Sequence, residues 1–511
     1  MTASGRVVTA SGALRGDVDD SRGLTVFRGV PYAAPPVGDR RFRAPQPVEP
    51  WDGVRDALAF GPAAVQPEGQ PSMFGGLFGS AGLGVSEDCL TLNVWTPAVD
   101  DRRRPTMVWI HGGAFRMGTA GAGGYDGSEL ARRGDVVVVS LNYRLGLLGF
   151  LCSPELGAAN AGLLDQVAAL EWVHREIARF GGDPDQVTVF GESAGGKSIE
   201  CLLAMPAARG LFSRAILQST YSPPMDVEAA AQRARDIAAE LGAGSADLEI
   251  LRSAPVDALL AAEQRAAAAA TAEGRTAPSG AGPVVDGTVL PRLPIEAVLE
   301  GSAASVPLLL GTTLDESRLF GALAPEPPVR DDETLAARLV SILPGDDPHR
   351  GRRAAAEYRR ARSERGESID PVDIWFAAST DATFRQHSIR LAEAYAARQP
   401  DTWMYLFSWA STSNEGRLGA FHAVELPFVF GTFDEPLGRL AGDSPEARSL
   451  GEAVQDAWLA FACTGRPKAS ALPDWPPYEP GRRATMVLGA TCEVVEAPMD
   501  DERRLWESLQ A

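Results

Sequence analysis

The chain has 511 residues, of which 45% are hydrophobic, and a formal net charge of −19. This length allows a large buried core, and the acidic balance disfavours nucleic acids and anionic membranes as partners. No run of about 18 apolar residues occurs, and residues 1–14 lack a basic head followed by an apolar core, so we expect neither a membrane span nor a secretory signal.

The absence of linkers, the choice of basic residues and the cysteine content favour a single-domain, cytoplasmic protein of bacterial origin. No Pro/Ser-rich linker, charge block or repeat divides the chain, so we expect one domain over residues 1–511. All basic residues except Lys197 and Lys468 are arginines, which is typical of a GC-rich bacterial genome. The five cysteines are scattered, as expected in a reducing compartment, and none has metal-ligand spacing, so we expect no metal site. They are Cys89, Cys152, Cys201, Cys463 and Cys492.

Apolar runs and helical periodicity alternate along the chain. Strands are predicted over residues 6–10, 24–30, 90–95, 106–110, 135–142, 187–190, 215–218, 306–311, 403–409 and 485–488. Helices are predicted over residues 161–180, 197–205, 227–241, 255–270 and 447–463, and residues 328–400 are mostly helical. Strands that alternate with helices indicate an α/β protein with a mainly parallel sheet, which binds ligands at the carboxyl ends of its strands.

Residues 61–85 are rich in glycine and proline and carry several large apolar side chains. We expect an apolar loop here, either a lid or pocket rim or an ordinary surface loop.

Residues 108–115 leave a predicted strand through a His-Gly-Gly turn. Such a turn exposes consecutive backbone N–H groups and matches the oxyanion loop of lipases and esterases. The alternative interpretation is a plain tight turn.

Residues 191–195 read Gly-Glu-Ser-Ala-Gly and lie between a predicted strand and a predicted helix. A serine in this setting predicts a nucleophile elbow, in which only glycine fits beside the serine. Ala194 follows Ser193 and begins the helix, so its N–H is a further candidate oxyanion donor.

The strand predicted over residues 306–311 leads into Thr-Thr-Leu-Asp-Glu. A carboxylate just beyond a buried parallel strand lies at the same sheet edge as Ser193. Asp315 and Glu316 both satisfy this condition, and the pattern alone does not separate them. The order serine, acid, histidine is the one found in α/β-hydrolases.

A serine hydroxyl needs an adjacent base, and imidazole suits the task because its ordinary pKa is near 6.5. Of five histidines, His422 is the best candidate, because it lies late in the chain among apolar residues. His111 lies in the glycine-rich turn, and His174 is inside a predicted helix. His349 and His387 lie in polar segments that we expect to be solvated.

Together these segments resemble the type-B carboxylesterase family, which includes bacterial para-nitrobenzyl esterases and the cholinesterases. The resemblance covers nearly the whole chain. The matching blocks are Phe-Arg-Gly-Val-Pro-Tyr-Ala at 27–33, Pro-Pro-Val-Gly at 35–38, Ser-Glu-Asp-Cys-Leu-Thr-Leu-Asn-Val at 86–94, Asn-Tyr-Arg at 142–144, Phe-Gly-Glu-Ser-Ala-Gly-Gly at 190–196 and Trp-Pro-x-Tyr at 475–478.

The resemblance implies an α/β-hydrolase fold with a large, mostly parallel central sheet flanked by helices. We expect helical insertions at 221–300 and 320–400 around the active-site mouth. The resemblance implies Ser193 as nucleophile, His422 as base and Glu316, not Asp315, as acid. It implies oxyanion donors at Gly113, Ala114 and Ala194, and supporting positions at Glu192 and Ser219, although Thr220 replaces the family's usual glycine. The candidate pocket walls are Phe74, Phe78, Leu319 and Phe320.

Two departures from the family narrow the expectations. Cys89 is the first cysteine, so the bridge that many secreted relatives form from this position to an earlier cysteine has no partner. No tryptophan lies between Trp51 and Trp95 to hold a quaternary ammonium, so we do not expect choline esters to be preferred.

The sequence therefore predicts a monomeric, cofactor-free serine carboxylesterase that acts on a small ester. A non-catalytic binding homologue is one alternative. An amidase, carbamate hydrolase or acyltransferase with the same triad is another.

Overall fold

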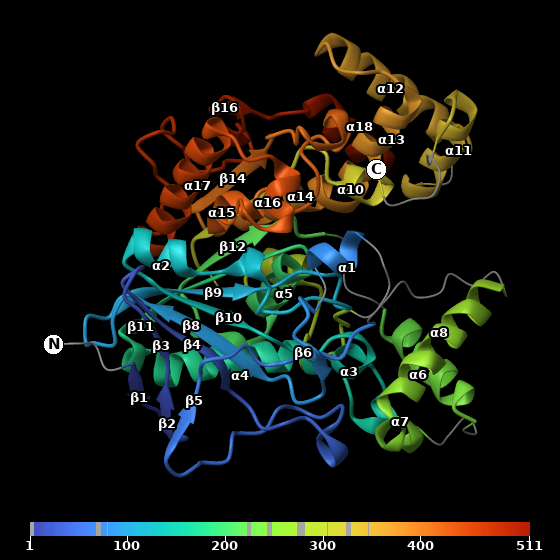
Figure 1. Cartoon of the computed structure of the whole chain (residues 1–511). Coiled ribbons are helices and arrows are strands. Elements are labelled where there is room, and N and C mark those ends of the chain that lie inside the picture. Colours follow the sequence, from blue (N-terminus) through green and yellow to red (C-terminus); the bar gives the residue numbers. More distant parts are fainter. Residues whose placement is uncertain are drawn as a thin grey trace. The chain divides into compact units, whose positions relative to one another are not determined.

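The structure, a computed structural model (Figure 1), describes residues 5–67, 73–78, 80–221, 226–242, 248–272, 282–303, 305–322, 329–345 and 347–510. The chain divides into two compact units. The first unit comprises Met1–Ile216 and Pro223–Val306, and the second comprises Leu217–Ser222 and Pro307–Ala511. Strand β12 (Arg214–Gln218) contains the point at which the chain passes from the first unit to the second.

The first unit is built on a sheet with the strand order β11-β9-β10-β8-β4-β3. Strand β9 pairs in parallel with β10 and β11, and β8, β4 and β3 continue the sheet in antiparallel pairs. Ile110, the last residue of β9, is in register with Leu141 and Gly191, so the segments that follow β9 and β11 start side by side. These strands are β3 (Asp17–Asp19), β4 (Leu24–Pro31), β8 (Thr91–Thr96), β9 (Arg104–Ile110), β10 (Val137–Leu141) and β11 (Gly182–Glu192).

Two small sheets accompany this large one. One has the order β1-β2-β5, and the other pairs β6 with β7 in parallel. Their strands are β1 (Arg6–Val8), β2 (Ala13–Arg15), β5 (Val54–Asp56), β6 (Ala63–Ala64) and β7 (Val85–Ser86).

Helices pack on the sheet of the first unit. Helix α5 packs against β9 and β11, and α4 packs against β11 through a buried face with Leu163, Val167 and Leu170 at helical spacing. The helices of this unit are α1 (Met73–Phe78), α2 (Ser128–Gly134), α3 (Gly146–Phe150), α4 (Ala161–Glu176), α5 (Ala194–Ala204), α6 (Val227–Glu240), α7 (Glu249–Ser253), α8 (Val256–Ala272) and α9 (Pro294–Glu300).

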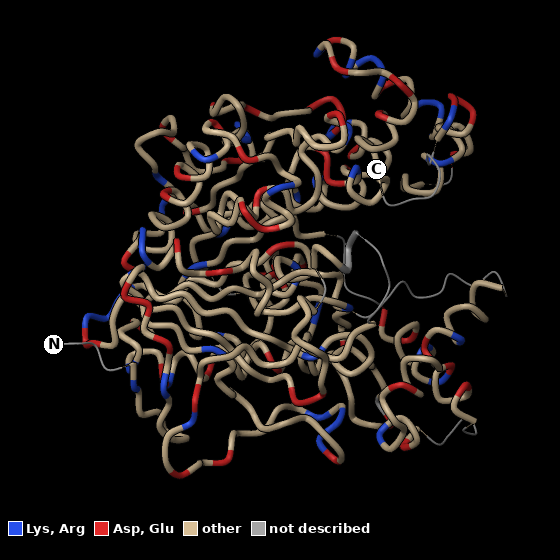
Figure 2. Tube along the Cα trace, in the orientation of Figure 1, with Lys and Arg blue, Asp and Glu red and all other residues tan. Residues whose placement is uncertain are grey.

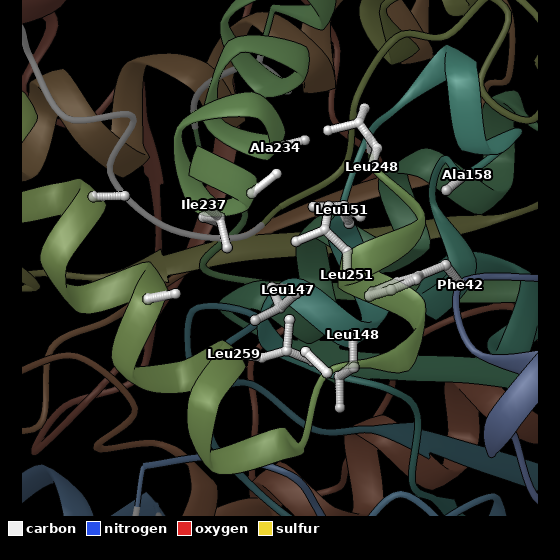
Figure 3. Close-up of a cluster of buried hydrophobic side chains, with 14 of the residues drawn as sticks. Phe42, Leu147, Leu148, Leu151, Ala158, Ala234, Ile237, Leu248, Leu251 and Leu259 are labelled. Carbon is white, nitrogen blue, oxygen red and sulfur yellow. The ribbon is translucent and has the colours of Figure 1, made fainter. Parts of the chain in front are cut away.

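Helices α6, α7 and α8 share an apolar core with α3. Figure 3 shows Ile237, Leu251 and Leu259, one from each of the three helices, gathered around Leu147 and Leu148 of α3. All five side chains are buried. Burial of this apolar surface attaches the predicted insertion to the body of the first unit.

The second unit contains the strand order β16-β15-β14-β13. Strands β13, β14 and β15 are parallel, and β16 is antiparallel to β15. These strands are β13 (Leu308–Thr313), β14 (Thr402–Phe407), β15 (Ala484–Leu488) and β16 (Glu493–Glu496). Every residue of β13 and β14 is buried, as expected for strands covered on both faces.

A second apolar core joins α11, α12, α13 and α18, and Leu339, Ile374 and Trp506 belong to it. The helices of the second unit are α10 (Ser317–Ala322), α11 (Asp332–Ile342), α12 (Arg350–Glu364), α13 (Pro371–Thr380), α14 (Gln386–Ala396), α15 (Leu426–Phe430), α16 (Pro436–Ala441), α17 (Pro445–Thr464) and α18 (Asp500–Gln510). A single π-helical turn, Asp381–Arg385, connects α13 to α14.

Each strand predicted from the sequence has a counterpart in the structure, although its ends differ. The strand predicted at 306–311 is β13, which begins and ends two residues later. The helix predicted at 161–180 is α4 followed by a short 3-10 turn, Ile177–Phe180. Short strands such as β16 were not predicted, because so few residues give little periodic signal.

Within residues 61–85, where we predicted a loop, the structure forms β6, α1 and β7; residues 68–72 and 79 lie outside the described part. In the residues that the structure describes, no helix is both long and apolar enough to cross a bilayer. Among the residues that the structure describes, Figure 2 shows basic and acidic residues interspersed along both units, without a large basic stretch.

Candidate active site

Ser193 occupies the sharp turn between β11 and α5. Its φ of 55° and ψ of −119° are unfavourable for a residue with a side chain, so the surrounding structure must hold it there. The glycines on either side of Ser193 allow the turn to pack tightly enough to hold this conformation. A Cβ on Gly191 would lie 2.7 Å from the carbonyl oxygen of Ile110, and a Cβ on Gly195 would overlap the same oxygen. Both glycines are therefore required by the close approach of the turn to β9.

Helix α5 begins directly after Ser193. Its first residue, Ala194, has an N–H at the positive end of the helix, and Lys197 N–H closes the first turn on Ser193 O at 2.8 Å. An anion that forms on a substrate bound at Ser193 would be stabilised by this helix end.

The His-Gly-Gly segment follows β9 in the same unit and packs on the serine turn. A Cβ on Gly112 would lie 2.8 Å from Glu192 O and 3.2 Å from the Cβ of Ser193. Gly113 has a φ of 105°, and Ala114, with a side chain, has a φ of 54°. Within the described ranges, no acceptor is assigned to the N–H groups of Gly113, Ala114 or Ala194. N–H groups without an acceptor in the protein can donate to an anion.

Gln66 holds the far end of this segment. Its Oε1 accepts from Gly118 N–H at 3.0 Å, while its Nε2 donates to Gly118 O at 2.9 Å and to Ala64 O at 3.0 Å. The side chain is buried, so these bonds are shielded from water. Sequence analysis did not identify Gln66, because a single glutamine in a Gly/Pro-rich segment carries no recognisable signal.

His111 lies beneath the segment rather than in solvent. Its Nδ1 is 2.8 Å from Gly112 O, and its ring stacks on Tyr143 with centroids 4.6 Å apart. A carbonyl only accepts, so the proton of the neutral ring is on Nδ1. Burial lowers the pKa of His111 to about 4, against the hydrogen bond to Gly112, which raises it.

This buried imidazole makes the stability of the protein depend on pH. The unfolded state binds a proton near pH 6.5 and the native state only near pH 4, so stability is full above pH 6.5 and is lost as pH falls through this window, by about 3 kcal/mol. We expect His111→Asn to flatten this dependence, because the amide still donates to Gly112 O but does not titrate. Urea unfolding at pH 4.5 and pH 7 measures the difference. His174→Asn, which removes an imidazole from the exposed face of α4, is the control.

Glu316 and His422 meet in the second unit. His422 Nδ1 lies 2.5 Å from Glu316 Oε2, and both side chains are buried. Glu316 Oε1 accepts from Ser219 Oγ at 2.7 Å and from Thr313 N–H at 2.8 Å. Because a carboxylate only accepts, it holds the proton of a neutral imidazole on Nδ1 and leaves Nε2 to accept another proton.

Asp315, the other acid considered from the sequence, has different contacts. Its Oδ2 accepts from Ala420 N–H at 3.0 Å, and its Oδ1 accepts from Arg318 Nε at 3.1 Å. Its backbone N–H donates to Ala420 O. Asp315 thus fixes the turn that precedes His422, while Glu316 contacts the imidazole itself.

The structure distributes the predicted residues over both units. Ser193, Glu192, Gly113, Ala114 and Ala194 belong to the first unit. Glu316, His422 and Ser219 belong to the second. Glu192 is buried with its carboxylate beside Gly112, and Ser219 bonds to the acid rather than to the histidine.

The other candidate bases and the pocket candidates differ in exposure. His174 and His349 are exposed, and His387 is half-buried in α14. Phe320 is 40% exposed, with its ring centroid 5.3 Å from that of His422, whereas Leu319 is fully buried. Phe78 is buried at the end of α1, and the side chain of Phe74 lies outside the described residues.

Comparison with known proteins identifies the family to which the chain is similar. The model of the carboxylesterase family matches residues 3–506. The chain is 40% identical to the para-nitrobenzyl esterase of Bacillus subtilis (strain 168) over 98% of this chain and 97% of that protein. It is 38% identical to the phenmedipham hydrolase of Pseudarthrobacter oxydans over 94% of each. A solved Geobacillus stearothermophilus carboxylesterase superposes with a TM-score of 0.85 at 38% identity, covering 98% of this chain and all of that one.

The chain belongs to the carboxylesterase family. The resemblance proposed from sequence blocks is thereby confirmed, and so is the α/β-hydrolase fold with its large, mostly parallel sheet and flanking helices. This carboxylesterase is a serine-dependent carboxylic ester hydrolase acting on small esters. Among its described residues, histidine, cysteine, aspartate and glutamate form no group of three or more suited to a metal ion.

Proposed function

We propose that Ser193 of the first unit and the Glu316–His422 pair of the second form the catalytic triad of this carboxylesterase. The observation that carries the proposal is the 2.5 Å contact between His422 Nδ1 and Glu316 Oε2, since it orients a buried imidazole with Nε2 left to act as base. The strained conformation of Ser193 supports its role as nucleophile.

Acylation begins when His422 Nε2 takes the hydroxyl proton as Ser193 Oγ attacks the ester carbonyl carbon. The carbonyl π electrons move to oxygen, and the N–H groups of Gly113, Ala114 and Ala194 stabilise this oxyanion. One good donor of this kind contributes about 3 kcal/mol to transition-state stabilisation. The intermediate then expels the alcohol, which leaves with the proton from His422.

Deacylation repeats these steps with water. His422 removes a proton from water, the hydroxide adds to the acyl carbon, and the same donors stabilise the second oxyanion. Expulsion of Ser193 Oγ, protonated by His422, releases the carboxylic acid and restores the enzyme. The Glu316 carboxylate stabilises the imidazolium in both halves of the cycle.

We also propose that both units form one catalytic domain spanning residues 1–511, with the helical insertions around residues 221–300 and 320–400 framing the active-site mouth. A bacterial origin is supported by the arginine bias, and a cytoplasmic location by the odd number and scattered positions of the five cysteines, which suggest no disulfide framework. We propose a monomer without a cofactor. For the substrate pocket, the exposed ring of Phe320 beside His422 is the best-supported wall.

A substrate comparison with active-site titration tests the proposed function. We expect a burst of p-nitrophenol from p-nitrophenyl acetate, and stoichiometric loss of activity when a fluorophosphonate adds one adduct at Ser193, as located by peptide mass spectrometry. Matched p-nitrophenyl acetate, p-nitroacetanilide and p-nitrophenyl carbamate should be hydrolysed with the ester fastest.

Three other results of these experiments would contradict the proposed function or the assignment of Ser193. A faster anilide or carbamate would replace carboxylesterase with amidase or carbamate hydrolase as the principal activity. An adduct on another serine, with full loss of activity, would contradict the assignment of Ser193. No adduct and no turnover would favour the non-catalytic homologue.

A further inference from the structure

The π-helical turn Asp381–Arg385 interrupts an otherwise continuous helical segment next to the acid–base pair. It lies between α13 and α14 of the second unit, and Asp381, Phe384 and Arg385 are all buried. One turn of π-helix redirects the side chains that it carries, and such turns occur often at functional sites. The contacts of this turn show what it redirects.

Phe384 of this turn packs on the imidazole of His422. The two ring centroids are 4.9 Å apart, with 36° between the planes. Phe320 lies on the same imidazole at 5.3 Å, and the rings of Phe320 and Phe384 are nearly parallel, at 5°. The geometry is that of attractive aromatic contacts, so the two phenylalanines limit the tilt of the imidazole while Glu316 fixes one edge of it.

The same segment also holds the backbone on both sides of Glu316. Arg385 Nη2 donates to Leu314 O at 2.6 Å, two residues before the acid. Thr380 Oγ1 accepts from Ser317 N–H at 3.1 Å, one residue after it. Residues 314–317 are therefore clamped by side chains from the end of α13 and from the π turn.

A buried hydrogen-bond chain fixes the turn to the helical core of the second unit. Arg385 Nη1 donates to Asp381 Oδ1 at 2.6 Å, and Tyr358 OH donates to Asp381 Oδ2 at 2.5 Å. Trp506 Nε1 in turn donates to Tyr358 OH at 2.7 Å. Since Tyr358 belongs to α12 and Trp506 to α18, the position of the turn is set by two other helices of the second unit.

We infer that Phe384 and Arg385 are positioning residues for the proposed acid–base pair. Phe384 orients the imidazole of His422, and Arg385 holds the segment that carries Glu316. The inference rests on the proposed triad and assigns to the π turn the task of keeping His422 Nε2 in the direction required for proton transfer. Misplacement of a reacting group by about 1 Å can lower a rate by about 100-fold, so a small rotation of the ring is enough to matter.

Two variants of the full chain test the inference, Phe384→Leu and Arg385→Met. We expect each to lower kcat for p-nitrophenyl acetate by about 10- to 100-fold with little change in KM, because proton transfer is affected and substrate contacts are not. The low-field proton NMR resonance of the short His422–Glu316 hydrogen bond, assigned by its absence in His422→Ala, should shift or broaden in both variants. Tyr358→Phe, which removes only one hydroxyl, should show the same changes in weaker form.

Phe461→Leu is the matched control, because Phe461 is a fully buried phenylalanine of the same unit that packs on Trp403 at 5.9 Å. It should lower thermal stability as much as Phe384→Leu while leaving kcat and the resonance unchanged. Equal losses of kcat in both variants, or an unaltered resonance in a folded Phe384→Leu protein, would overturn the inference. If His422→Ala retains full kcat, the proposed triad fails instead, and the resonance still reports whether the π turn positions the ring.

Discussion

Replacement of Ser193 by alanine is expected to lower kcat on the order of 10⁴- to 10⁶-fold. Without Oγ no acyl-enzyme can form, and only the oxyanion donors and the binding site remain to accelerate hydrolysis by water. The fold should persist, because the smaller alanine side chain still fits between Gly191 and Gly195, and removal of one hydroxyl leaves the packing of α5 on β11 intact. Burst kinetics with p-nitrophenyl acetate and the midpoint of thermal unfolding measure the two effects.

A second serine in the same helix supplies the control. Ser198 is fully buried in α5, and its Oγ accepts from Gln166 Nε2 at 2.9 Å. Ser198→Ala should cost some stability and leave kcat within about 10-fold of the parent. A Ser193→Ala protein that still shows the burst, or still reacts with a fluorophosphonate, would exclude Ser193 as nucleophile.

Exchange of Glu316 for glutamine is expected to lower kcat/KM by about 10³- to 10⁴-fold. Ser219 and Thr313 both donate to Oε1, so the amide oxygen of the glutamine takes that position and its NH2 group faces His422. An NH2 group can only donate to Nδ1, which forces the imidazole proton onto Nε2, and Nε2 then no longer acts as a base. The loss should therefore appear mainly in kcat.

Asp315→Asn is the matched change at the neighbouring acid. Asparagine keeps one oxygen for Ala420 N–H and gives up only part of the pairing with Arg318, so kcat/KM should stay within about 10-fold of the parent. Steady-state kinetics of both variants, with thermal unfolding as a check on the fold, decide between the acids. The reverse order of losses would make Asp315 the acid of the triad.

The sequence predicted the fold class and most of the candidate site because the groups lie directly after buried strands. Ser193 follows β11 and the His-Gly-Gly turn follows β9, and buried strands are recognisable as apolar runs. Parallel pairing of β9 with β11 then brings both segments to one sheet edge. The sequence was sufficient to place these two segments together, because their positions depend on short-range patterns and on one rule of parallel-sheet topology.

Local sequence patterns could not decide whether Asp315 or Glu316 is the carboxylate that contacts His422. The two acids are neighbours and differ by one methylene, and what separates them is the approach of Ser219 and His422 from distant parts of the chain. The family resemblance implied Glu316, and the contacts of Asp315 with Ala420 give the physical reason for the difference.

Gln66 and the π turn escaped prediction for the same reason. The glutamine acts through two bonds to Gly118, fifty-two positions away in the sequence, and the π turn lies in a stretch whose composition predicts ordinary helix. Hydrogen-bond partners of this kind are selected by tertiary packing, so neither propensity nor periodicity encodes them.

The carbonyl oxygen of Ile110 fills the space where a side chain at position 195 would begin. Laboratory evolution of this esterase is therefore not expected to yield active variants substituted at Gly195. Even alanine at this position would have to displace strand β9. Substitutions must instead be made at exposed side chains outside this turn, where they leave the backbone that supports Ser193 undisturbed. In evolved variants of this enzyme, we therefore expect substitutions at exposed side chains and none at Gly195.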